Sequence, residues 1–352
     1  MKLGLNLGYW SGDATTNTEN VALAVAAESM GFDSIWAAEA YGSDSASVLA
    51  WIGAQTEKIK IGSAIFQIPA RTPAMTAMTA ATLDALSGGR FQLGLGISGP
   101  QVSEGWHGVR FDAPLARTRE YISIVSMALQ REQVKFEGTH YQLPLPDGPG
   151  KSLRLTIHPA RANIPILLAA VGPKNLELCG ELTQGWLAVF LAPSFAHEQI
   201  SHLRMGREKA NKNLENFEIV STIPIVPGRD LEMCANLVRP YAALYVGGMG
   251  SKEKNFYNAL AVRMGYEKEA ALVQEKYLAK DYEAAMMALP FDFLDQTSLL
   301  GGPDRMAEKM QEHAAAGVTT LALALPDSVP YEARIRGLRM AVEALEKSGV
   351  GE

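Results

Sequence analysis

Cysteine is scarce in this sequence, because Cys179 and Cys234 are its only two cysteines in 352 residues. They lie far apart in the sequence and show no metal-site spacing. We expect both thiols to be reduced and buried, as in a cytoplasmic protein.

Positive charge and long apolar runs are scarce as well. The 32 Lys and Arg are outnumbered by 38 Asp and Glu, which gives a formal net charge of -6 without any basic block. We therefore expect neither nucleic acid nor an anionic membrane surface as a partner. No apolar run is long enough to span a membrane, and the start MKLGLNLGYW lacks the pattern of a signal peptide. A soluble, unexported protein is expected.

Short apolar runs alternate with helical patterns along nearly the whole chain. We expect strands at residues 3–8, 34–39, 59–66, 91–97, 164–171, 186–191, 217–226 and 319–325. We expect helices at residues 18–30, 47–56, 73–86, 115–129, 173–182, 194–211, 231–245, 303–316 and 331–347. Eight strands with helices between them predict an α/β protein, a (β/α)8 TIM barrel. We predict one domain over 1–352, with insertions at the C-terminal face near 131–163 (with a small hairpin) and 247–297.

In such a barrel the active site lies where the strands end. The residues expected there are mostly small or apolar, at 8–10, 38–41, 64–67, 97–99, 170–172 and 190–192, and only Glu39 among them is charged. Metal-assisted hydrolysis needs clustered ligands, but the six histidines show no ligand spacing. Neither a G-x-S-x-G elbow nor a strand-end lysine is present. We predict no metal, and a site for a large flat cofactor that supplies the reactive atom.

The stretch LGLGISGPQVSEGWHG, residues 93–108, contains G-x-G-x-x-G at 94–99. A dinucleotide fingerprint needs a helix that begins inside the glycine run, whereas here Pro100 follows and we expect no helix before about residue 115. We favour a strand that stays thin where a ring packs, followed by a loop with Gln101, Trp106 and His107. The alternative is crowding inside the barrel, since glycine suits places that other backbone approaches closely.

Residues 171–175, VGPKN, place a strand end before a helix that begins at Pro173. Free N–H groups and the helix dipole favour an anion there, with Lys174 nearby. A phosphate is the expected ligand, and an ordinary strand-to-helix turn with a solvated lysine is the alternative.

The order of elements and four segments resemble the bacterial-luciferase-like superfamily. The segments are GFDSIWAAEAYGSD, KIGSAIFQIPARTPAMTA, LSGGRFQLGLGISGPQVSEGWHG and AAVGPKNLELCGEL. More narrowly, the chain resembles the 5-deazaflavin (coenzyme F420)-dependent oxidoreductases of this superfamily, over about residues 2–345. The resemblance implies transfer of a hydride between C5 of F420 and a small organic substrate, and a homodimer.

The resemblance also implies where the cofactor binds. Family members hold the ring in the barrel mouth against a bulge after the third strand, often with a non-prolyl cis peptide, which matches Ala64-Ile65. The segment after the fifth strand lies near the ribityl and phosphate end. The implied cofactor-binding residues are Glu39, Ala64, Ile65, Gln67, Gly96, Ile97, Ser98, Gln101, Val171, Gly172, Pro173, Lys174 and Asn175.

This chain departs from the family at one implied catalytic position. Several deazaflavin enzymes of the family carry Asp-His after the second strand, whereas this chain has Glu39-Ala40. Sugar-phosphate dehydrogenation that relies on that histidine is therefore in doubt. We expect Glu39 to orient the ring or act as an acid or base, with a salt-bridged carboxylate as the alternative. His107 is expected to supply a proton, with a solvated loop histidine as the alternative.

Further residues are assigned by their positions. Asp44 is expected to cap the next helix, and the substrate pocket is expected to be shaped by Tyr9, Trp10, Tyr41 and Trp106. The segment 247–297 is expected to cover the mouth. Three other functions stay open: an FMN-dependent luciferase-like monooxygenase, a non-catalytic flavin- or deazaflavin-binding paralogue, and a cofactor-free aldolase or isomerase.

Overall fold

Parallel strands form a closed barrel in the computed structural model, which describes residues 1–352 except Tyr9, Ser11 and Asp327. The barrel strands are β1 (Lys2–Asn6), β2 (Ser34–Ala37), β3 (Lys60–Ser63), β5 (Phe91–Gly96), β8 (Ile166–Ala169), β9 (Gly185–Val189), β10 (Glu218–Pro227) and β12 (Thr320–Ala324). Each pairs with the next, β9 pairs with β10, and β12 lies between β10 and β1. The TIM barrel and its eight predicted strands are confirmed. The expectation for Tyr9 lies outside the described residues.

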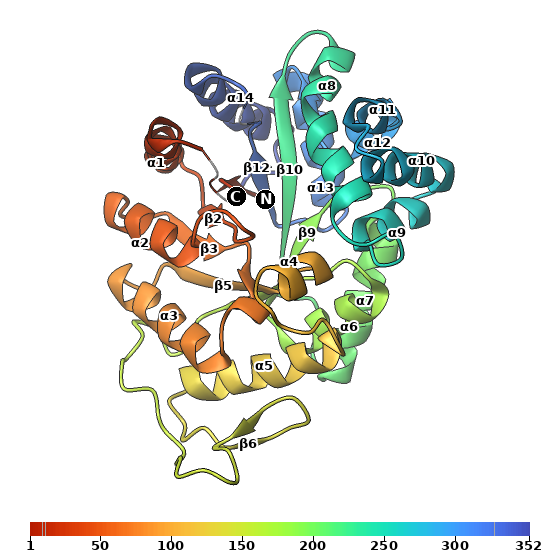
Figure 1. The fold of residues 1–352 in the computed structure, drawn as a ribbon. Coiled ribbons are helices and arrows are strands. Elements are labelled where there is room, and N and C mark those ends of the chain that lie inside the picture. Colours follow the sequence, from red (N-terminus) through yellow and green to blue (C-terminus); the bar gives the residue numbers. More distant parts are fainter. Residues whose placement is uncertain (9, 11, 327) are drawn as a thin grey trace.

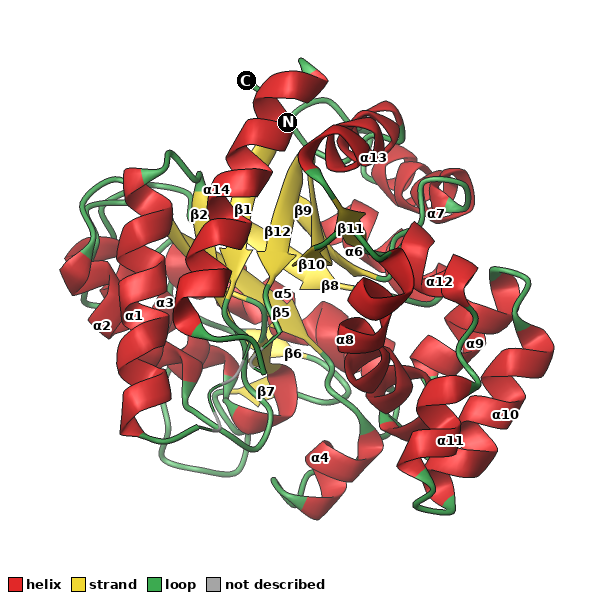
Figure 2. Cartoon of the chain, turned by 90° about the horizontal axis from the view of Figure 1, so that it is seen from above, coloured by secondary structure: helices red, strands yellow, loops and turns green. Residues whose placement is uncertain are grey.

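Helices surround the barrel on its outer side, as the view from above shows (Figure 2). They are α1 (Ala14–Ser29), α2 (Ser45–Gln55), α3 (Pro73–Leu86), α5 (Pro114–Leu129), α6 (Pro173–Leu182), α7 (Ala196–Lys209), α8 (Leu231–Ala243), α13 (Pro303–Ala315) and α14 (Tyr331–Ser348). All match predicted helices, because apolar periodicity and local caps mark them. Asp44 accepts a hydrogen bond from the Ser47 amide, which confirms its capping role. No helix in the described part of the chain is long and apolar enough to cross a membrane.

Three short elements differ from the expectation. A helix, α4 (Pro100–Gly105), begins directly after the glycine run, so the expectation of no helix before about residue 115 is wrong. Pro100 was interpreted as a break, but proline at the first helical position favours helix initiation. The strands β4 (Phe66–Gln67), beside β5, and β11 (Leu299–Gly301), beside β10, were not predicted as separate elements.

Two segments lie outside the repeating pattern. The first contains the antiparallel hairpin β6 (Phe136–Glu137) and β7 (Gln142–Leu143), as expected. After α8 comes a π-helical turn, η2 (Leu244–Gly248), followed by α9 (Phe256–Arg263), α10 (Glu267–Leu278), α11 (Tyr282–Met287) and α12 (Phe291–Gln296). Figures 1 and 2 place α8 to α12 together on one side of the barrel.

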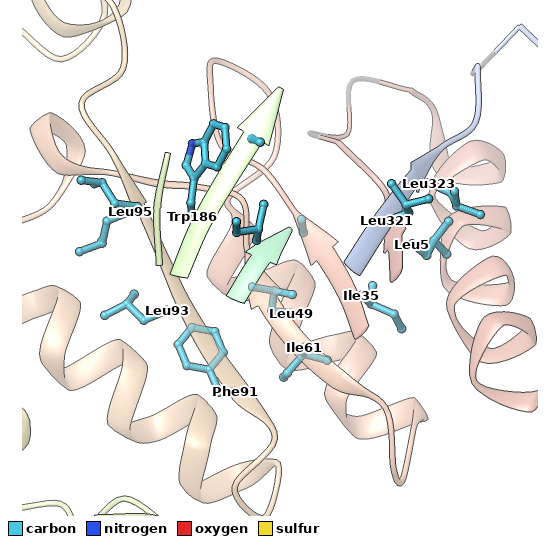
Figure 3. Close-up of a cluster of buried hydrophobic side chains, with 14 of the residues drawn as sticks. Leu5, Ile35, Leu49, Ile61, Phe91, Leu93, Leu95, Trp186, Leu321 and Leu323 are labelled. Atoms are coloured by element: carbon cyan, nitrogen blue, oxygen red, sulfur yellow. The ribbon is translucent and has the colours of Figure 1, made fainter. Parts of the chain in front are cut away.

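The core has two layers that follow the alternation of side chains along each strand. Phe91, Leu93 and Leu95 of β5 belong to the large cluster between barrel and helices (Figure 3). Trp36 and Leu187 belong to a smaller cluster with Leu167, Val220 and Ala322. These five residues come from five different barrel strands. Leu187 directly follows Trp186, which points outward, so the side chain of Leu187 points inward and this cluster fills the barrel interior. Cys179 and Cys234 are buried and unpaired, as predicted.

Candidate functional site

A cavity of about 650 Å³ opens at the carboxyl ends of the barrel strands. It is lined by residues that follow β2, β3, β5 and β8, by side chains of β9 and β10, and by η2 and α9. Every cofactor-binding residue predicted from the sequence lines this cavity, from Glu39 through Asn175. They share one cavity because a parallel barrel brings all carboxyl ends of its strands to one face.

Of the other residues predicted to belong to the site, one lines the cavity and three do not. Tyr41 lines the cavity. Trp10, Trp106 and His107 do not belong to its lining, and the Trp106 side chain is exposed. His107 lies just after α4, and its Nε2 is buried without a hydrogen-bond partner among the described residues.

The glycines of β5 are explained by close contacts within the barrel. A Cβ on Gly94 would lie 1.8 Å from the carbonyl oxygen of Ser63, and a Cβ on Gly96 would lie 2.4 Å from Cδ1 of Ile65. Crowding, the alternative considered for this motif, therefore accounts for both positions. Ile65 is in turn placed by the interruption between β3 and β4, where the Ala64-Ile65 peptide is cis, as the family resemblance implied.

Hydrogen bonds connect the ends of three strands beneath the cavity. The Gln67 side chain, buried after β3, donates to the Ala40 carbonyl at 3.0 Å and accepts from Ser98 Oγ at 2.7 Å. The Gln67 amide donates to Glu39 Oε2 at 3.3 Å. Ser98 has φ 61°, a left-handed conformation that is unfavourable for a residue with a side chain. The Gln67 bond helps to hold this conformation at the cavity wall.

Glu39 is held by an arginine that sequence reasoning missed. Arg71 Nη2 donates to Glu39 Oε1 and to Asp44 Oδ1, and its guanidinium stacks over Phe66 at 4.6 Å. The side chains of Glu39 and Arg71 are 7% and 14% exposed, so the pair is mostly shielded from water. Burial acts to raise the pKa of Asp44, but the hydrogen bonds from Ser47 and the charge of Arg71 outweigh it and lower that pKa. The salt-bridged alternative for Glu39 is thus present in the structure.

The start of α6 combines free backbone donors with an unsatisfied amide oxygen. Pro173 begins the helix, and Gly172 provides no side-chain cap. Asn175 lines the cavity and is 8% exposed, and its Oδ1 has no hydrogen-bond partner among the residues that the structure describes. A buried polar atom without a partner is costly, so it favours a ligand that can bond to it.

Lys174 is already paired at the same helix start. Its Nζ lies 2.9 Å from Glu177 Oε1, and Lys209 Nζ lies 2.6 Å from Glu177 Oε2. These two lysines, Lys209 first, lower the pKa of Glu177 to about 2. The Lys174 side chain is 76% exposed, so it can turn toward a ligand at modest cost.

The wall opposite the strand ends comes from η2 and the start of α9. Leu244, Tyr245, Met249, Phe256 and Tyr257 line the cavity, and none of them was predicted as a site residue. The expectation that residues 247–297 cover the mouth identified part of this region but none of its side chains, and Leu244 and Tyr245 precede that segment. Burial raises the pKa of Tyr257 to about 12, so its phenol is neutral at physiological pH and can donate a hydrogen bond.

The chemistry available here matches an organic cofactor. Among the described residues, no group of three or more His, Cys, Asp or Glu is placed to hold a metal ion. Small and apolar residues at the ends of β2, β3, β5 and β8 leave room for a planar ring, while Gly172 and Asn175 offer polar contacts at one end. This arrangement fits a long cofactor with an apolar ring and a polar tail.

The chain is similar to known proteins in sequence and in fold. The family model "Luciferase-like monooxygenase" matches residues 5–320. The chain is 44% identical, over 91% of its length and 94% of the relative, to "Putative coenzyme F420-dependent oxidoreductase Rv3520c" of Mycobacterium tuberculosis. It is 27% identical to 5,10-methylenetetrahydromethanopterin reductase of Archaeoglobus fulgidus, over 85% of this chain and 87% of the relative. The coenzyme F420 dependent tetrahydromethanopterin reductase from Methanopyrus kandleri shares the fold, with a TM-score of 0.80, 22% identity and coverage of 98% and 97%.

Proposed function

This chain belongs to the luciferase-like monooxygenase family, and we propose that it is a coenzyme F420-dependent oxidoreductase that transfers a hydride between the deazaflavin C5 and a small organic substrate. The observation that carries the proposal is that residues from four strand ends, implied by the deazaflavin resemblance, all line one cavity. The 44% identity to a relative named for F420 supports the choice of cofactor.

Coenzyme F420, when bound, supplies the carbon that gives or accepts the hydride. Ala64, Ile65 and the strand end at Gly96–Ser98 would hold its planar ring. Its ribityl and phosphate part lies at the start of α6, where Gly172 offers backbone N–H and Asn175 an unpaired oxygen. Lys174 leaves Glu177 to contact the phosphate.

We assign Glu39 the role of orienting the bound ring. Arg71 and the Gln67 amide fix its carboxylate, so it is an acceptor held in one position at the cavity wall. His107 stays a prediction as a proton donor, because it lies near α4 outside the lining residues.

The test is a parallel fluorescence titration of the apoprotein with F420 and FMN. We expect saturable F420 binding and much weaker FMN binding. The variant Asn175→Leu, which removes the unpaired Oδ1, should weaken F420 binding. Asn258→Leu, whose amide donates to the carbonyls of Val246 and Ala270, is the matched control outside the cavity lining. Tight FMN binding with little F420 binding would favour the reduced-flavin monooxygenase, and F420 binding without turnover of any substrate would favour the non-catalytic paralogue.

We further propose a cytoplasmic homodimer. Two buried, unpaired cysteines fit a reducing compartment. The neighbouring helices α2 and α3 expose Trp51, Met75, Met78 and Leu86, at 62%, 49%, 51% and 75%. Large exposed apolar side chains on two neighbouring helices support a second copy there. Sedimentation of the wild type and Trp51→Glu tests this, with a monomeric wild type as the contrary result.

A further inference from the structure

The charged groups around the cavity place a limit on the substrate. Among the described residues of the lining, only Glu39 and Lys174 carry a formal charge. Glu39 is paired with Arg71, and Lys174, which pairs with Glu177, is assigned to the cofactor phosphate, so neither charge is left for a substrate. A charged substrate would have to enter this cavity without an unpaired counter-charge, which is costly in an apolar surrounding.

Cationic side chains do occur nearby, but in a separate cavity. Arg71, Arg110 and Arg117 line a smaller space of about 260 Å³ that shares Ile97 and Pro114 with the main cavity. Arg117 is paired with Asp112 at 2.7 Å, and Arg71 with Glu39 and Asp44. Arg71 and Arg117 are thus already paired, and Arg110 is not among the described residues that line the main cavity.

The wall formed by η2 and α9 is aromatic and apolar. Tyr257 packs edge-on against Tyr245, with ring centroids 4.8 Å apart, and Leu244, Met249 and Phe256 complete this wall. Phe190 supports it from behind, 6.2 Å from the Tyr257 ring. Such a wall binds flat apolar groups through ring stacking and removal of water from apolar surface.

One polar group on this wall lacks a partner. The Tyr257 hydroxyl makes no hydrogen bond to any residue that the structure describes, although its backbone N–H is fixed by Asn255 at the helix cap. The residue is only partly exposed, and it lines the cavity. A neutral phenol in this position can donate one hydrogen bond to a ligand oxygen.

We propose that the substrate is an uncharged, mostly apolar molecule with a carbonyl oxygen, and that Tyr257 donates a hydrogen bond to this oxygen. The proposal rests on the proposed function, because it assigns the substrate of the same cavity. It excludes sugar phosphates and other polyanions as substrates. Tyr257 is thus a substrate-binding residue supplied by the segment that follows the π-helical turn.

The experiment measures binding to F420-loaded protein by calorimetry, so it does not depend on turnover. Three probes are compared: 1-indanone, its hydrocarbon counterpart indane, and glucose 6-phosphate. We expect 1-indanone to bind more tightly than indane and glucose 6-phosphate not to bind. In Tyr257→Phe the affinity for 1-indanone should fall about 3- to 10-fold, the range for one neutral hydrogen bond, while that for indane stays unchanged. Tyr282→Phe, which alters an exposed tyrosine, is the matched control.

The outcomes separate the two proposals. If glucose 6-phosphate binds and 1-indanone does not, the proposal of an uncharged substrate is refuted. Equal loss of affinity for 1-indanone and indane in Tyr257→Phe would overturn the hydrogen bond, and the wild-type comparison of the three probes stands even if that variant fails to fold. Failure of F420 itself to bind would refute the proposed function, and this proposal with it.

Discussion

Two glycines on the same strand should respond very differently to the same substitution. Gly94 and Gly96 of β5 are two residues apart, so a Cβ on either would point to the barrel interior. At Gly94 the new atom would lie 1.8 Å from Ser63 O and 2.7 Å from Leu187 Cδ1, whereas real Cβ contacts essentially never fall below 3.0 Å. The backbone of β3 would have to move by the difference, 3.0 minus 1.8, or at least 1.2 Å.

That movement has a cost that can be estimated. Ser63 Oγ donates to the Gly94 carbonyl at 2.8 Å and accepts from the Gly94 amide at 2.9 Å, so the shift strains both bonds. Losing them costs about 0.5–1.5 kcal/mol each, and overpacking costs about 1–3 kcal/mol. The lower entropy of the unfolded alanine chain returns about 0.4–1 kcal/mol. We expect Gly94→Ala to lose about 1–5 kcal/mol, which at the upper end is a large part of the stability of an ordinary domain.

Gly96→Ala is the matched control, because the atom in its way is the end of a side chain. Its Cβ would meet Ile65 Cδ1 at 2.4 Å, and Ile65 can turn at a cost of about 1 kcal/mol. Stability should therefore change little, while the displaced Ile65 narrows the cavity and weakens F420 binding. Thermal unfolding and F420 titration measure both effects. A melting temperature of Gly94→Ala equal to that of the wild type, or a larger loss in Gly96→Ala, would refute this reasoning.

Two further predictions concern charged groups. Arg71→Leu leaves the buried Glu39 carboxylate with only the hydrogen bond from the Gln67 amide. The free energy of unfolding, measured in urea, should fall by about 3 kcal/mol, and Glu39→Gln in the same background should restore more than half of it. A fall of less than about 0.5 kcal/mol for Arg71→Leu would contradict the pairing. The pKa of Glu177 is lowered from its ordinary value of 4.5 to about 2, so its ionised form stabilises the fold above pH 4.5 and this contribution is lost as the pH falls toward 2. Glu177→Gln should be less stable than the wild type at pH 7, and this difference in stability should shrink below pH 4.5. The control Glu346→Gln, which changes an exposed residue, should match the wild type at every pH. A difference for Glu177→Gln that does not change with pH would refute the lowered pKa of Glu177.

The parts of this molecule that were predictable are set by local sequence. Strand and helix periods alternate clearly enough to give the barrel, and a barrel places every strand end at one face. Gly172 and Pro173 determine the backbone geometry of a single turn, so the start of the helix at Pro173 could be predicted from these residue types alone. The residues predicted to bind the cofactor followed from these two facts together with the family resemblance, and the structure shows that they line one cavity.

The parts that were missed depend on contacts between distant segments. Arg71 reaches Glu39 across 32 positions of sequence, and nothing local distinguishes it from a solvated arginine. Tyr257 reaches the cavity only because η2 and α9 fold back over the barrel. Pro100 carried a local signal for α4, but the same residue also marks turns, and the choice between the two depends on the following residues.

One hydrogen bond between the inserted segment and the barrel affects how chimeras of such barrels can be designed. Arg263, at the end of α9, donates through Nη2 to the carbonyl of Val171 at 2.8 Å, and Val171 is part of the cavity wall before α6. The segment that carries Tyr257 therefore also supports the wall assigned to the cofactor. Under the two proposals above, a chimera that takes residues 244–263 from a relative would change the substrate wall and the cofactor wall together unless the graft keeps a donor at position 263. The proposed choice of substrate and the proposed binding of the cofactor would then be coupled through this one segment.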